Sequence, residues 1–498
     1  MCGIAGIIDP TGRDLDPSWI AAMTSRLAPR GPDGEGSWSA PGVALGHRRL
    51  AVIDLSDAAA QPLGNEDGSV QVVFNGEIYN FQELREELAG RGHVFRSRSD
   101  TEVLVHGYEE WGDDLLLRID GMFAFAIWDA SQRRLLAGRD RMGKKPFYFA
   151  QIARDGELPM FAFASELKAL LVLPGFDRRI DSEALCRYLV HEYVPPPHSI
   201  FRGARKLAAG ERLRLETLPD VALVPRIDRY WDLSFPAEPR HMSDDEAAAR
   251  LREILRESVR RRLVADVPVG IFLSGGIDSS SVAALAAETA GPGNVHTFSV
   301  GFSEASFDES SYARRVAGYL GTQHREEHLD PRALLDILPT VGDFLDEPFA
   351  DASVVPTYLL SRFTRRHVTV ALGGDGGDEL FAGYQTFVAD AWGRVFFDHA
   401  PASLRAAIAG AARWLPARSG YFSLDFKVNQ FLQGGDVPGP RRHQRWLASF
   451  LPEQLPALLA PELARALPGD PLAAVDARAQ GGPAVAGWDR LLDFYARF

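Results

Sequence analysis

Cys2 is the residue whose type and position most clearly suit catalysis, because it directly follows the initiator methionine. A small residue at this position normally permits removal of Met1, which leaves a thiol and a free α-amine on one residue. An α-amine titrates near pH ~8, so it can accept the thiol proton directly or through water. The resulting thiolate is a strong nucleophile toward an amide carbonyl. The pattern indicates amide hydrolysis without a catalytic histidine, although an isolated Met-Cys start is more often incidental.

Short motifs in the first hundred residues favour the catalytic interpretation. They are Cys2-Gly3-Ile4-Ala5-Gly6, Arg30-Gly31-Pro32-Asp33, Gly46-His47-Arg48-Arg49-Leu50, Asn75-Gly76-Glu77-Ile78-Tyr79-Asn80 and Ser99-Asp100-Thr101-Glu102. Together they resemble the N-terminal-nucleophile glutamine amidotransferases. One departure is Pro29, where many members of that family have histidine. Arg139-Asp140-Arg141 and Lys144-Lys145-Pro146-Phe147-Tyr148 also match the family, and we interpret them as architecture beside the site.

The resemblance implies a role for each matched position. Attack on glutamine produces an oxyanion that needs fixed donors, each worth roughly 2.7–4 kcal/mol. By resemblance the donors are the Asn75 side-chain amide and the Gly76 backbone N–H, so the catalytic set is Cys2, Asn75 and Gly76. In isolation Asn-Gly is more typical of a hairpin turn. The remaining glutamine contacts implied by the family are Arg49 to the α-carboxylate, Glu77 and Asp100 to the α-amino group, and Leu50.

A second motif, Ser274-Gly275-Gly276-Ile277-Asp278-Ser279-Ser280, lies between a predicted strand and a predicted helix. Small residues there let backbone N–H groups and hydroxyls approach phosphate at the helix N-terminus. The loop has no Walker A lysine. It resembles the pyrophosphate-binding loop of enzymes that cleave ATP to AMP through an acyl-adenylate, and the preceding Asp266-Val267-Pro268-Val269-Gly270 extends the match. A lone Gly-Gly turn would more often be structural.

A third motif, Gly373-Gly374-Asp375-Gly376-Gly377-Asp378-Glu379, follows another predicted strand. Parallel-sheet sites collect at the carboxyl ends of strands, so the two loops are expected to meet over ATP. The resemblance is to the glutamine-hydrolysing asparagine synthetases of the asparagine synthetase B type. It implies ATP contacts from Leu273, Ser274, Gly275, Gly276, Asp278, Ser279, Val300, Gly373 and Gly374. It also implies Mg²⁺ on Asp278 and Asp378, and a catalytic role for Asp375 in ammonia attack on a β-aspartyl-adenylate.

Two positions leave the acceptor open. Gly373 stands where the best-known members have serine, and Asp375 stands where they have glutamate. The same Gly-Asp-Gly-Gly-Asp form occurs in relatives linked to polysaccharide gene clusters. Asp346-Glu347-Pro348-Phe349-Ala350-Asp351, followed by Pro356-Thr357, also matches the family and is expected to shape the acceptor pocket.

The elements that must position these residues change in type along the chain. The first half has short apolar runs that predict strands, at 70–74, 123–128, 134–138 and 160–164, with clear helices only at 16–27 and 81–91. Prolines and mixed charge then mark a linker, and Ser243 with Glu246 forms a capping-box pair that starts an amphipathic helix. Beyond it, strands and helices alternate in a doubly wound pattern, with strands expected within 267–273, 297–300, 326–329 and 368–372.

We therefore expect three segments. Residues 1–212 form a class II glutamine amidotransferase domain with the α+β αββα sandwich of N-terminal-nucleophile hydrolases, and 213–242 form the linker. Residues 243–498 form an α/β parallel-sheet ATP-pyrophosphatase domain of the adenine nucleotide alpha hydrolase type. Family members usually continue well past Phe498, with further helices and a lysine that acts on the phosphates, so we expect this domain to be incomplete at its C-terminus.

Composition narrows the class of protein. A net charge of −13 argues against a nucleic-acid partner, and two cysteines, Cys2 and Cys186, support neither a disulfide framework nor a cysteine-based zinc site. We expect Cys186 to be a core thiol. No run reaches the roughly 20 apolar residues that span a bilayer, and no secretory leader is present, so we expect a cytoplasmic protein without a membrane partner.

Three functions stay open at this stage. The first is complete asparagine synthesis from glutamine, aspartate and ATP with Mg²⁺. The second is amidotransfer to another carboxylate, for example in polysaccharide assembly. The third is a bare glutaminase or a non-synthetic interaction partner, favoured by the short C-terminal segment and opposed by the intact Ser274–Ser280 loop. A homodimer and a complementing C-terminal chain are both open as partners.

Overall fold

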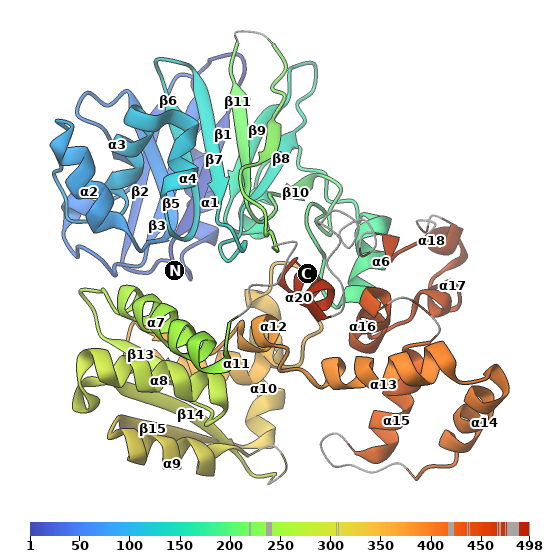
Figure 1. Ribbon diagram of the computed structural model, residues 1–498. Helices are drawn as coiled ribbons and strands as arrows, with labels where there is room; N and C mark the ends of the chain where they lie inside the picture. The colour runs from blue at the N-terminus through green and yellow to red at the C-terminus, as the bar shows by residue number, and fades with distance from the viewer. Residues whose placement is uncertain are drawn as a thin grey trace. The chain divides into compact units, whose positions relative to one another are not determined.

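The apolar runs of the first half form two antiparallel sheets of six strands each in the computed structural model (Figure 1). The structure describes residues 1–498 except 219–220, 236–241, 305, 307, 417–422, 436, 438, 466, 468–469, 474, 476–487 and 498. The chain divides into two units, of which unit 1 comprises Met1–Ala184, Val194–Asp232 and Val264–Val267. Unit 2 comprises Leu185–Tyr193, Leu233–Leu263 and Pro268–Phe498.

Unit 1 is a four-layer α/β/β/α sandwich. The strands of its first sheet, in spatial order, are β10 (Ala204–Lys206), β8 (Tyr148–Ile152), β9 (Met160–Ala164), β1 (Gly3–Ile8), β3 (Val43–Arg49) and β2 (Gly34–Ala40). Those of the second are β12 (Arg226–Arg229), β11 (Glu211–Glu216), β7 (Arg134–Arg139), β6 (Gly121–Asp129), β5 (Val70–Ile78) and β4 (Leu63–Gly64). Its helices are α1 (Pro17–Arg26), α2 (Phe81–Gly90), α3 (Glu102–Trp111), α4 (Leu115–Arg118) and α5 (Leu167–Leu170). This confirms the predicted α+β sandwich.

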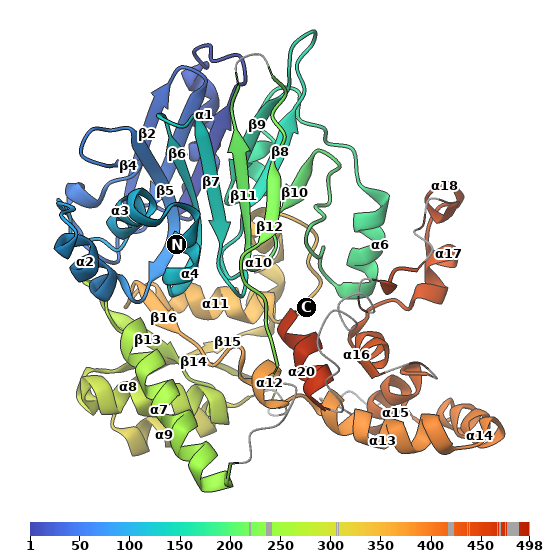
Figure 2. The same ribbon diagram turned by 45° about the horizontal axis from the view of Figure 1, so that its top comes forward.

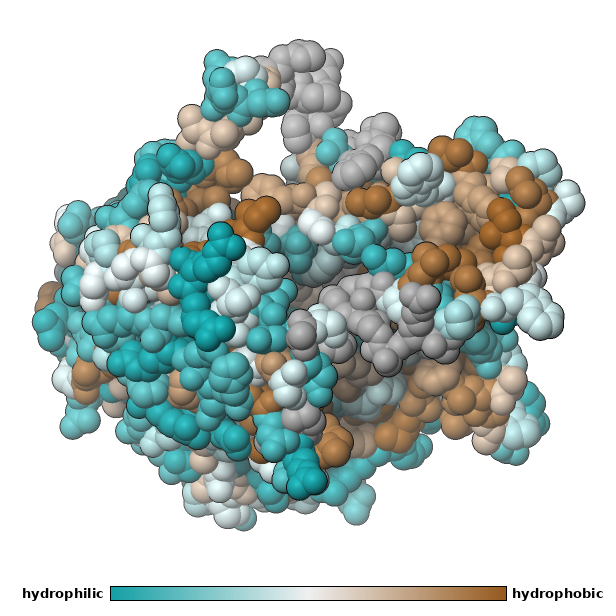
Figure 3. All heavy atoms as spheres, turned by 90° about the horizontal axis from the view of Figure 1, so that it is seen from below, coloured by the Kyte–Doolittle hydropathy of each residue, from teal (hydrophilic) through white to brown (hydrophobic). Residues whose placement is uncertain are grey.

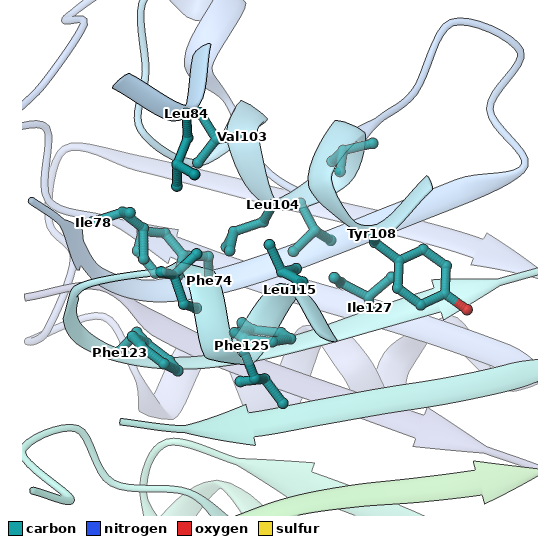
Figure 4. Close-up of a cluster of buried hydrophobic side chains, with 14 of the residues drawn as sticks. Phe74, Ile78, Leu84, Val103, Leu104, Tyr108, Leu115, Phe123, Phe125 and Ile127 are labelled. Atoms are coloured by element: carbon teal, nitrogen blue, oxygen red, sulfur yellow. The ribbon is translucent and has the colours of Figure 1, made fainter. Parts of the chain in front are cut away.

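Two apolar cores hold the layers of unit 1 together. One lies between the sheets and joins side chains such as Ile4 and Leu45 of the first sheet to Val73 and Trp128 of the second. The other lies between the second sheet and helices α2, α3 and α4, where Phe74 and Phe125 meet Leu84, Leu104 and Leu115 (Figure 4). Alternation along β5 therefore sends Phe74 toward the helices and Val73 toward the first sheet.

The predicted elements of the first half are largely present. Helix α1 begins after Asp16, whose carboxylate accepts the backbone N–H of Ser18, and α2 ends at Gly90. Three of the predicted strands are parts of β5, β6 and β7, and the fourth, 160–164, is the whole of β9. The expected linker, 213–242, is different: it contains most of β11 and all of β12, which pair in the second sheet of unit 1. Arginines and prolines concealed these strands, and residues 219–220 and 236–241 of that segment lie outside the described residues.

Unit 2 is built on a parallel four-stranded sheet in the order β15 (Gln323–Leu329), β14 (His296–Phe302), β13 (Val269–Phe272), β16 (Val370–Leu372). Around the sheet lie α7 (Asp244–Arg262), α8 (Ile277–Ala290), α9 (Ser310–Leu320), α10 (Pro331–Phe344) and α11 (Val354–Thr364), as Figure 2 shows. The predicted capping box of α7 forms, because the Ser243 hydroxyl accepts the Glu246 N–H and the Glu246 carboxylate accepts the Ser243 N–H. The doubly wound prediction is confirmed.

The rest of unit 2 is helical. Its helices are α12 (Gly377–Phe381), α13 (Gln385–His399), α14 (Ala402–Ala412), α15 (Leu424–Gln433), α16 (Gly439–Leu447), α17 (Leu455–Leu458), α18 (Pro461–Arg465) and α20 (Trp488–Arg497), and α6 (Ser182–His191) adds its C-terminal part. Cys186 of α6 is buried in an apolar cluster with Leu455 and Phe494, which confirms its prediction as a core thiol. Figure 3 shows separate hydrophobic areas on one face of the molecule. Within the described ranges, no helix combines the length and apolarity needed to cross a membrane.

Candidate active sites

Strand alternation in unit 1 directs Cys2 and Asn75 to the space between the two sheets. Ile4 and Ile8 of β1 face the inter-sheet core, so the alternation extends back to Cys2. Val73 of β5 faces the same core from the second sheet, and Asn75 follows it by two residues. The sheets touch nearby, because His47 Nε2 of β3 lies 3.1 Å from the carbonyl oxygen of Phe74. The predicted nucleophile and oxyanion donor thus come from facing strands.

The motifs around Cys2 fix its position. Its Sγ lies 3.4 Å from the Leu50 backbone nitrogen and 3.7 Å from the Leu50 carbonyl oxygen. Arg30 Nε donates to the Cys2 carbonyl oxygen at 2.9 Å, and its NH1 pairs with Glu166 at 2.9 Å. Burial raises the pKa of the Cys2 thiol, while the backbone contact with Leu50 opposes that rise. A half-buried thiol with a raised pKa needs a nearby base, which suits the expected α-amine.

Asn75 lies within strand β5, which excludes the hairpin alternative for Asn75-Gly76. Its side chain is 0% exposed, and neither its Nδ2 nor its Oδ1 has a hydrogen-bond partner among the described residues. An unpaired buried amide costs about 1–3 kcal/mol, so such an amide is expected where a ligand supplies the partner. Gly76 is required by the close approach of β6: a Cβ there would lie 2.2 Å from the Met122 carbonyl oxygen.

Hydrogen bonds to backbone groups hold two charged side chains of the predicted glutamine site, those of Arg49 and Asp100. Arg49 ends β3, and its guanidinium donates to the carbonyl oxygens of Asp54 and Ser56. Asp100 lies in the segment before α3, where its Oδ2 accepts the Ile78 backbone N–H at 2.9 Å, one residue beyond Glu77. Burial raises the pKa of Asp100 to about 6, and the hydrogen bond from Ile78 opposes the rise. Asp100 is thereby held against the end of β5 that carries Asn75, Gly76 and Glu77.

Lys145, which we interpreted from the sequence as architecture, lies beside Cys2. It is buried, and its Nζ contacts the sulfur of Met1, the residue before Cys2. Burial lowers the pKa of Lys145 to about 8, and the charge of Glu77 opposes this. The neighbouring Asp140 is structural, because its carboxylate accepts the backbone N–H groups of Phe123, Lys144 and Lys145. The predicted architectural role therefore fits Asp140, whereas the Lys145 side chain reaches the site itself.

In unit 2 the Ser274–Ser280 loop joins β13 to α8. Ser274 Oγ and Ser279 Oγ lie 3.0 Å apart, and Ser274 Oγ accepts the Gly276 N–H at 3.2 Å. Gly275 has φ +87°, and a Cβ on it would lie 2.6 Å from the Tyr312 backbone carbon, so glycine is required. Gly276 is the N-cap of α8, whose first residues are Ile277 and Asp278. The loop thus presents hydroxyls and a helix N-terminus together, as a phosphate needs.

The third motif meets this loop. Strand β16 pairs with β13 on the side opposite β14, so the strand order reverses between β13 and β16, where doubly wound sheets bind ligands. A Cβ on Gly374 would lie 2.7 Å from the Ser279 nitrogen and 2.9 Å from the Asp278 Cβ. Burial and the charge of Asp278 raise the pKa of Asp378. Two carboxylates that repel each other in this way suit a divalent cation between them.

The other predicted ATP contacts lie on the same sheet. Leu273 directly follows β13, where it is buried and donates its N–H to the Phe298 carbonyl oxygen at 2.8 Å. Val300 lies in the adjacent strand β14. Asp375 is exposed, and its Oδ2 lies over Gly373, where an added Cβ would be 2.3 Å away. In the segment expected to shape the acceptor pocket, the Ala350 N–H donates to the Glu192 carbonyl oxygen at 2.9 Å.

Comparison with known proteins agrees with this two-part organisation. Residues 1–231 match the family described as glutamine amidotransferase domain, and residues 250–468 match the family described as asparagine synthase. The chain is 36% identical to asparagine synthetase [glutamine-hydrolyzing] 1 of Bacillus subtilis over 390 residues, which is 78% of this chain and 59% of that protein. It is 40% identical to a putative asparagine synthetase [glutamine-hydrolyzing] of Mycobacterium tuberculosis over 441 residues, 84% of this chain and 65% of that protein.

A third relative is covered more fully. The chain is 35% identical to putative asparagine synthetase [glutamine-hydrolyzing] 2 of Methanocaldococcus jannaschii over 406 residues, 78% of this chain and 76% of that protein. The chain spans less than two thirds of the length of the Bacillus and Mycobacterium relatives. Fold and sites define an N-terminal-nucleophile amidotransferase unit joined to an ATP-pyrophosphatase-type unit. The chain belongs to the family of glutamine-hydrolysing asparagine synthetases.

Proposed function

We propose that the protein makes asparagine from aspartate with glutamine as the nitrogen donor. The reaction is ATP + L-aspartate + L-glutamine + water to AMP + diphosphate + L-asparagine + L-glutamate. The observation that supports this proposal is that some residues expected to act together lie near one another within each unit. In unit 1 the Asn75 amide, which has no hydrogen-bond partner among the described residues, lies on the sheet that faces Cys2, and in unit 2 Gly374 lies against Asp278 and Ser279.

The glutaminase half begins when the Cys2 thiol gives its proton to the α-amine. The sulfur attacks the carboxamide carbon of glutamine, and the oxyanion receives hydrogen bonds from Asn75 Nδ2 and the Gly76 N–H. The carbon–nitrogen bond breaks, and ammonia leaves with the proton held by the α-amine. Water then hydrolyses the thioester to glutamate. Arg49 holds the substrate α-carboxylate, Glu77 and Asp100 hold its α-amino group, and Leu50 lines the site.

The synthetase half activates the acceptor. A carboxylate oxygen of aspartate attacks the α-phosphorus of ATP, and diphosphate leaves. Ammonia then attacks the carbonyl carbon of the β-aspartyl-adenylate, Asp375 accepts its surplus proton, and AMP leaves. The serines and glycines of the two loops bind ATP, with Leu273 and Val300 against the nucleotide. Asp278 and Asp378 are the carboxylates that fit Mg²⁺, which when bound neutralises charge on the phosphates.

A second candidate is amidotransfer to a carboxylate other than aspartate. It is favoured by the pair Gly373 and Asp375, because the Asp375 carboxylate folds back over a position that has no side chain. A serine at 373 would displace that carboxylate. Gly373 and Asp375 are therefore compatible with each other, where the best-known members of the family have serine and glutamate. Together they change the surface that would contact the acceptor.

The test is product formation by the purified chain given glutamine, aspartate and Mg-ATP. We expect glutamate and AMP from the wild type. Cys2→Ala should release no glutamate but should still form AMP when ammonium replaces glutamine. Glutamate without AMP contradicts asparagine synthesis by this chain. A panel of other carboxylates then tests the second candidate, since AMP that appears only with one of them identifies the acceptor.

A further inference from the structure

A cluster of two histidines and four glutamates lies in unit 1, outside the residues assigned to catalysis. His106, Glu102, Glu109 and Glu110 belong to α3. His93 lies in the segment between α2 and α3, and Glu66 lies in the turn between β4 and β5. Gly92, with φ +105°, turns the chain at the end of α2, and the His93 N–H donates to the Leu88 carbonyl oxygen at 3.2 Å. The fold thus brings His93 to the side of α3.

Ring nitrogens and carboxylate oxygens converge at the centre of this cluster. One atom each from His93, His106 and Glu109 lies within 4.8 Å of the others. Glu109 Oε2 is 3.2 Å from His106 Nδ1 and 3.7 Å from His93 Nδ1. Glu66 Oε2 is 3.9 Å from His106 Nδ1. A tetrahedral zinc ion with ligands about 2.0–2.1 Å away places those ligands roughly 3.4 Å apart, so the spacing suits one small cation.

The surroundings of the two rings match those of metal ligands. His106 Nε2 lies 3.6 Å from Glu102 Oε1, and His93 Nε2 lies 3.6 Å from Glu110 Oε2. Each ring therefore has one nitrogen toward the centre and the other 3.6 Å from a carboxylate, which is beyond hydrogen-bond distance but places beside the ring the kind of partner that a metal-bound histidine uses. The Glu109 carboxylate is also oriented, because its Oε1 accepts Asn65 Nδ2 at 2.8 Å. His106 is 2% exposed, whereas Glu66 and Glu109 are exposed and leave an entry path.

We propose that this cluster binds a divalent transition-metal cation of the zinc type. The ligands are His93 Nδ1, His106 Nδ1, Glu109 Oε2 and Glu66 Oε2. Two imidazole nitrogens and two carboxylate oxygens suit Zn²⁺, whereas Mg²⁺ prefers an all-oxygen octahedron. The competing occupant of the cluster is a proton on His106, which would pair with the same carboxylates without any metal.

The cation would join three segments that are far apart in the sequence. Glu102 connects it to the predicted glutamine site, because its Oε1 accepts the Arg96 N–H at 2.7 Å and its Oε2 accepts the Ser97 N–H at 2.8 Å. The segment secured in this way continues into Asp100. A bound cation is therefore expected to stabilise unit 1 and to lower the KM for glutamine. The second effect rests on the proposed glutaminase function, whereas binding itself does not.

The test is titration of the chelator-treated full chain with ZnCl₂ alone, followed by calorimetry, in a Cys2→Ser background that removes the half-buried Cys2 thiol as a competing zinc ligand. We expect one equivalent to bind and Co²⁺ to give the visible absorption of a four-coordinate site. His93→Gln should weaken binding at least ~10-fold. The matched control is His198→Gln, because His198 Nε2 likewise lies 3.6 Å from a glutamate, Glu183, outside the cluster. The control should bind as the parent does.

Other results would overturn the proposal. They are an absence of Zn²⁺ binding, an unchanged affinity in His93→Gln, or equal losses in His93→Gln and His198→Gln. Circular dichroism checks that the variants fold. If His93→Gln does not fold, the test is repeated with Glu109→Gln, which changes an exposed residue among the proposed ligands. The KM for glutamine is measured separately on the wild-type chain, which keeps Cys2. Zinc binding with an unaltered KM for glutamine would keep the site and remove only its link to Asp100. Failure of glutamine hydrolysis by the metal-free wild-type chain would concern the proposed function and not the cation.

Discussion

At the scale of single residues, the most informative side chain is Asn75. Its amide is fully buried without a hydrogen-bond partner among the described residues, although Gly76 beside it is fitted closely to β6. An orphaned amide reduces the stability of the resting protein and is retained when it serves a transition state. We therefore expect Asn75→Ala to fold at least as stably as the wild type while losing most of its glutaminase activity.

The expected loss for Asn75→Ala is ~10²–10³-fold in kcat for glutamate release, with a much smaller change in KM. Asn75→Asp keeps the shape of the side chain but replaces the donor with a carboxylate, so its loss should be at least as large. Ammonium-dependent AMP formation serves as the internal control. A loss of unfolding free energy in Asn75→Ala, or a KM effect that dominates, would show that the amide is a structural or ground-state contact.

Asp100 carries a prediction about pH. Burial raises its pKa to about 6, so below that pH the carboxylate takes up a proton and ceases to attract the α-ammonium group of glutamine. The Cys2 α-amine, with an ordinary pKa near ~8, already gives the profile of kcat/KM one acidic slope. We expect the slope to steepen from one to two as pH falls through about 6. If the pH profile of Asp100→Asn steepens in the same way, the steepening belongs to another titrating group.

At the scale of elements, the strand ends of unit 2 were predictable and the strands around 213–229 were not. Apolar runs ending in glycine and serine identify β13 and β16 because a buried parallel strand needs apolar side chains on both faces. Strand β12 is the edge strand of the second sheet, and β11 beside it carries Arg212 and Arg214, which pair with Asp228 of β12. Edge strands tolerate charge, so their sequence looks like a linker.

The same contrast applies to the candidate sites. Motif resemblance predicted Cys2, Asn75 and the two loops of unit 2, because each combines small or reactive residues in a fixed order. Lys145 was interpreted as architecture, since nothing in its neighbouring sequence states that its side chain is buried beside Cys2. The cluster of His93, His106, Glu66 and Glu109 was missed because its residues are spread over three segments. Only the turn at Gly92 and the face of α3 bring them together.

Gly374 tests whether the two loops must touch. A Cβ at this position would lie 2.7 Å from the Ser279 nitrogen and 2.9 Å from the Asp278 Cβ, so Gly374→Ala must push the loops apart. A misplacement of ~1 Å can cost ~10²-fold in rate, and we expect that loss in ATP–diphosphate exchange. Glutamate release should be unaffected. Gly318→Ala in α9, where an added Cβ meets nothing within 4 Å, is the matched control. Equal exchange rates in the two variants would contradict the model of a shared site.

At the scale of the whole molecule, each unit has apolar clusters of its own. Unit 1 is held by the inter-sheet core and by the core beneath α2, α3 and α4, and unit 2 by clusters that include Ile271 and Phe298. Units with separate cores can unfold in separate transitions. A ligand that binds the folded form of one unit stabilises that unit by about 2.7 kcal/mol when its concentration is 100 times Kd.

We therefore expect calorimetric unfolding to show two transitions that respond to different ligands. Mg-ATP should raise the Tm of one transition, and a glutamine analogue that alkylates Cys2 should raise the Tm of the other. Cys2→Ala should abolish the second shift and keep the first, whereas Gly374→Ala should do the reverse and Gly318→Ala should keep both. If either ligand moves both transitions equally, or if one variant abolishes both shifts, the two chemistries do not reside in separately folded units. The assignment of glutaminase to unit 1 and of ATP chemistry to unit 2 would then fail.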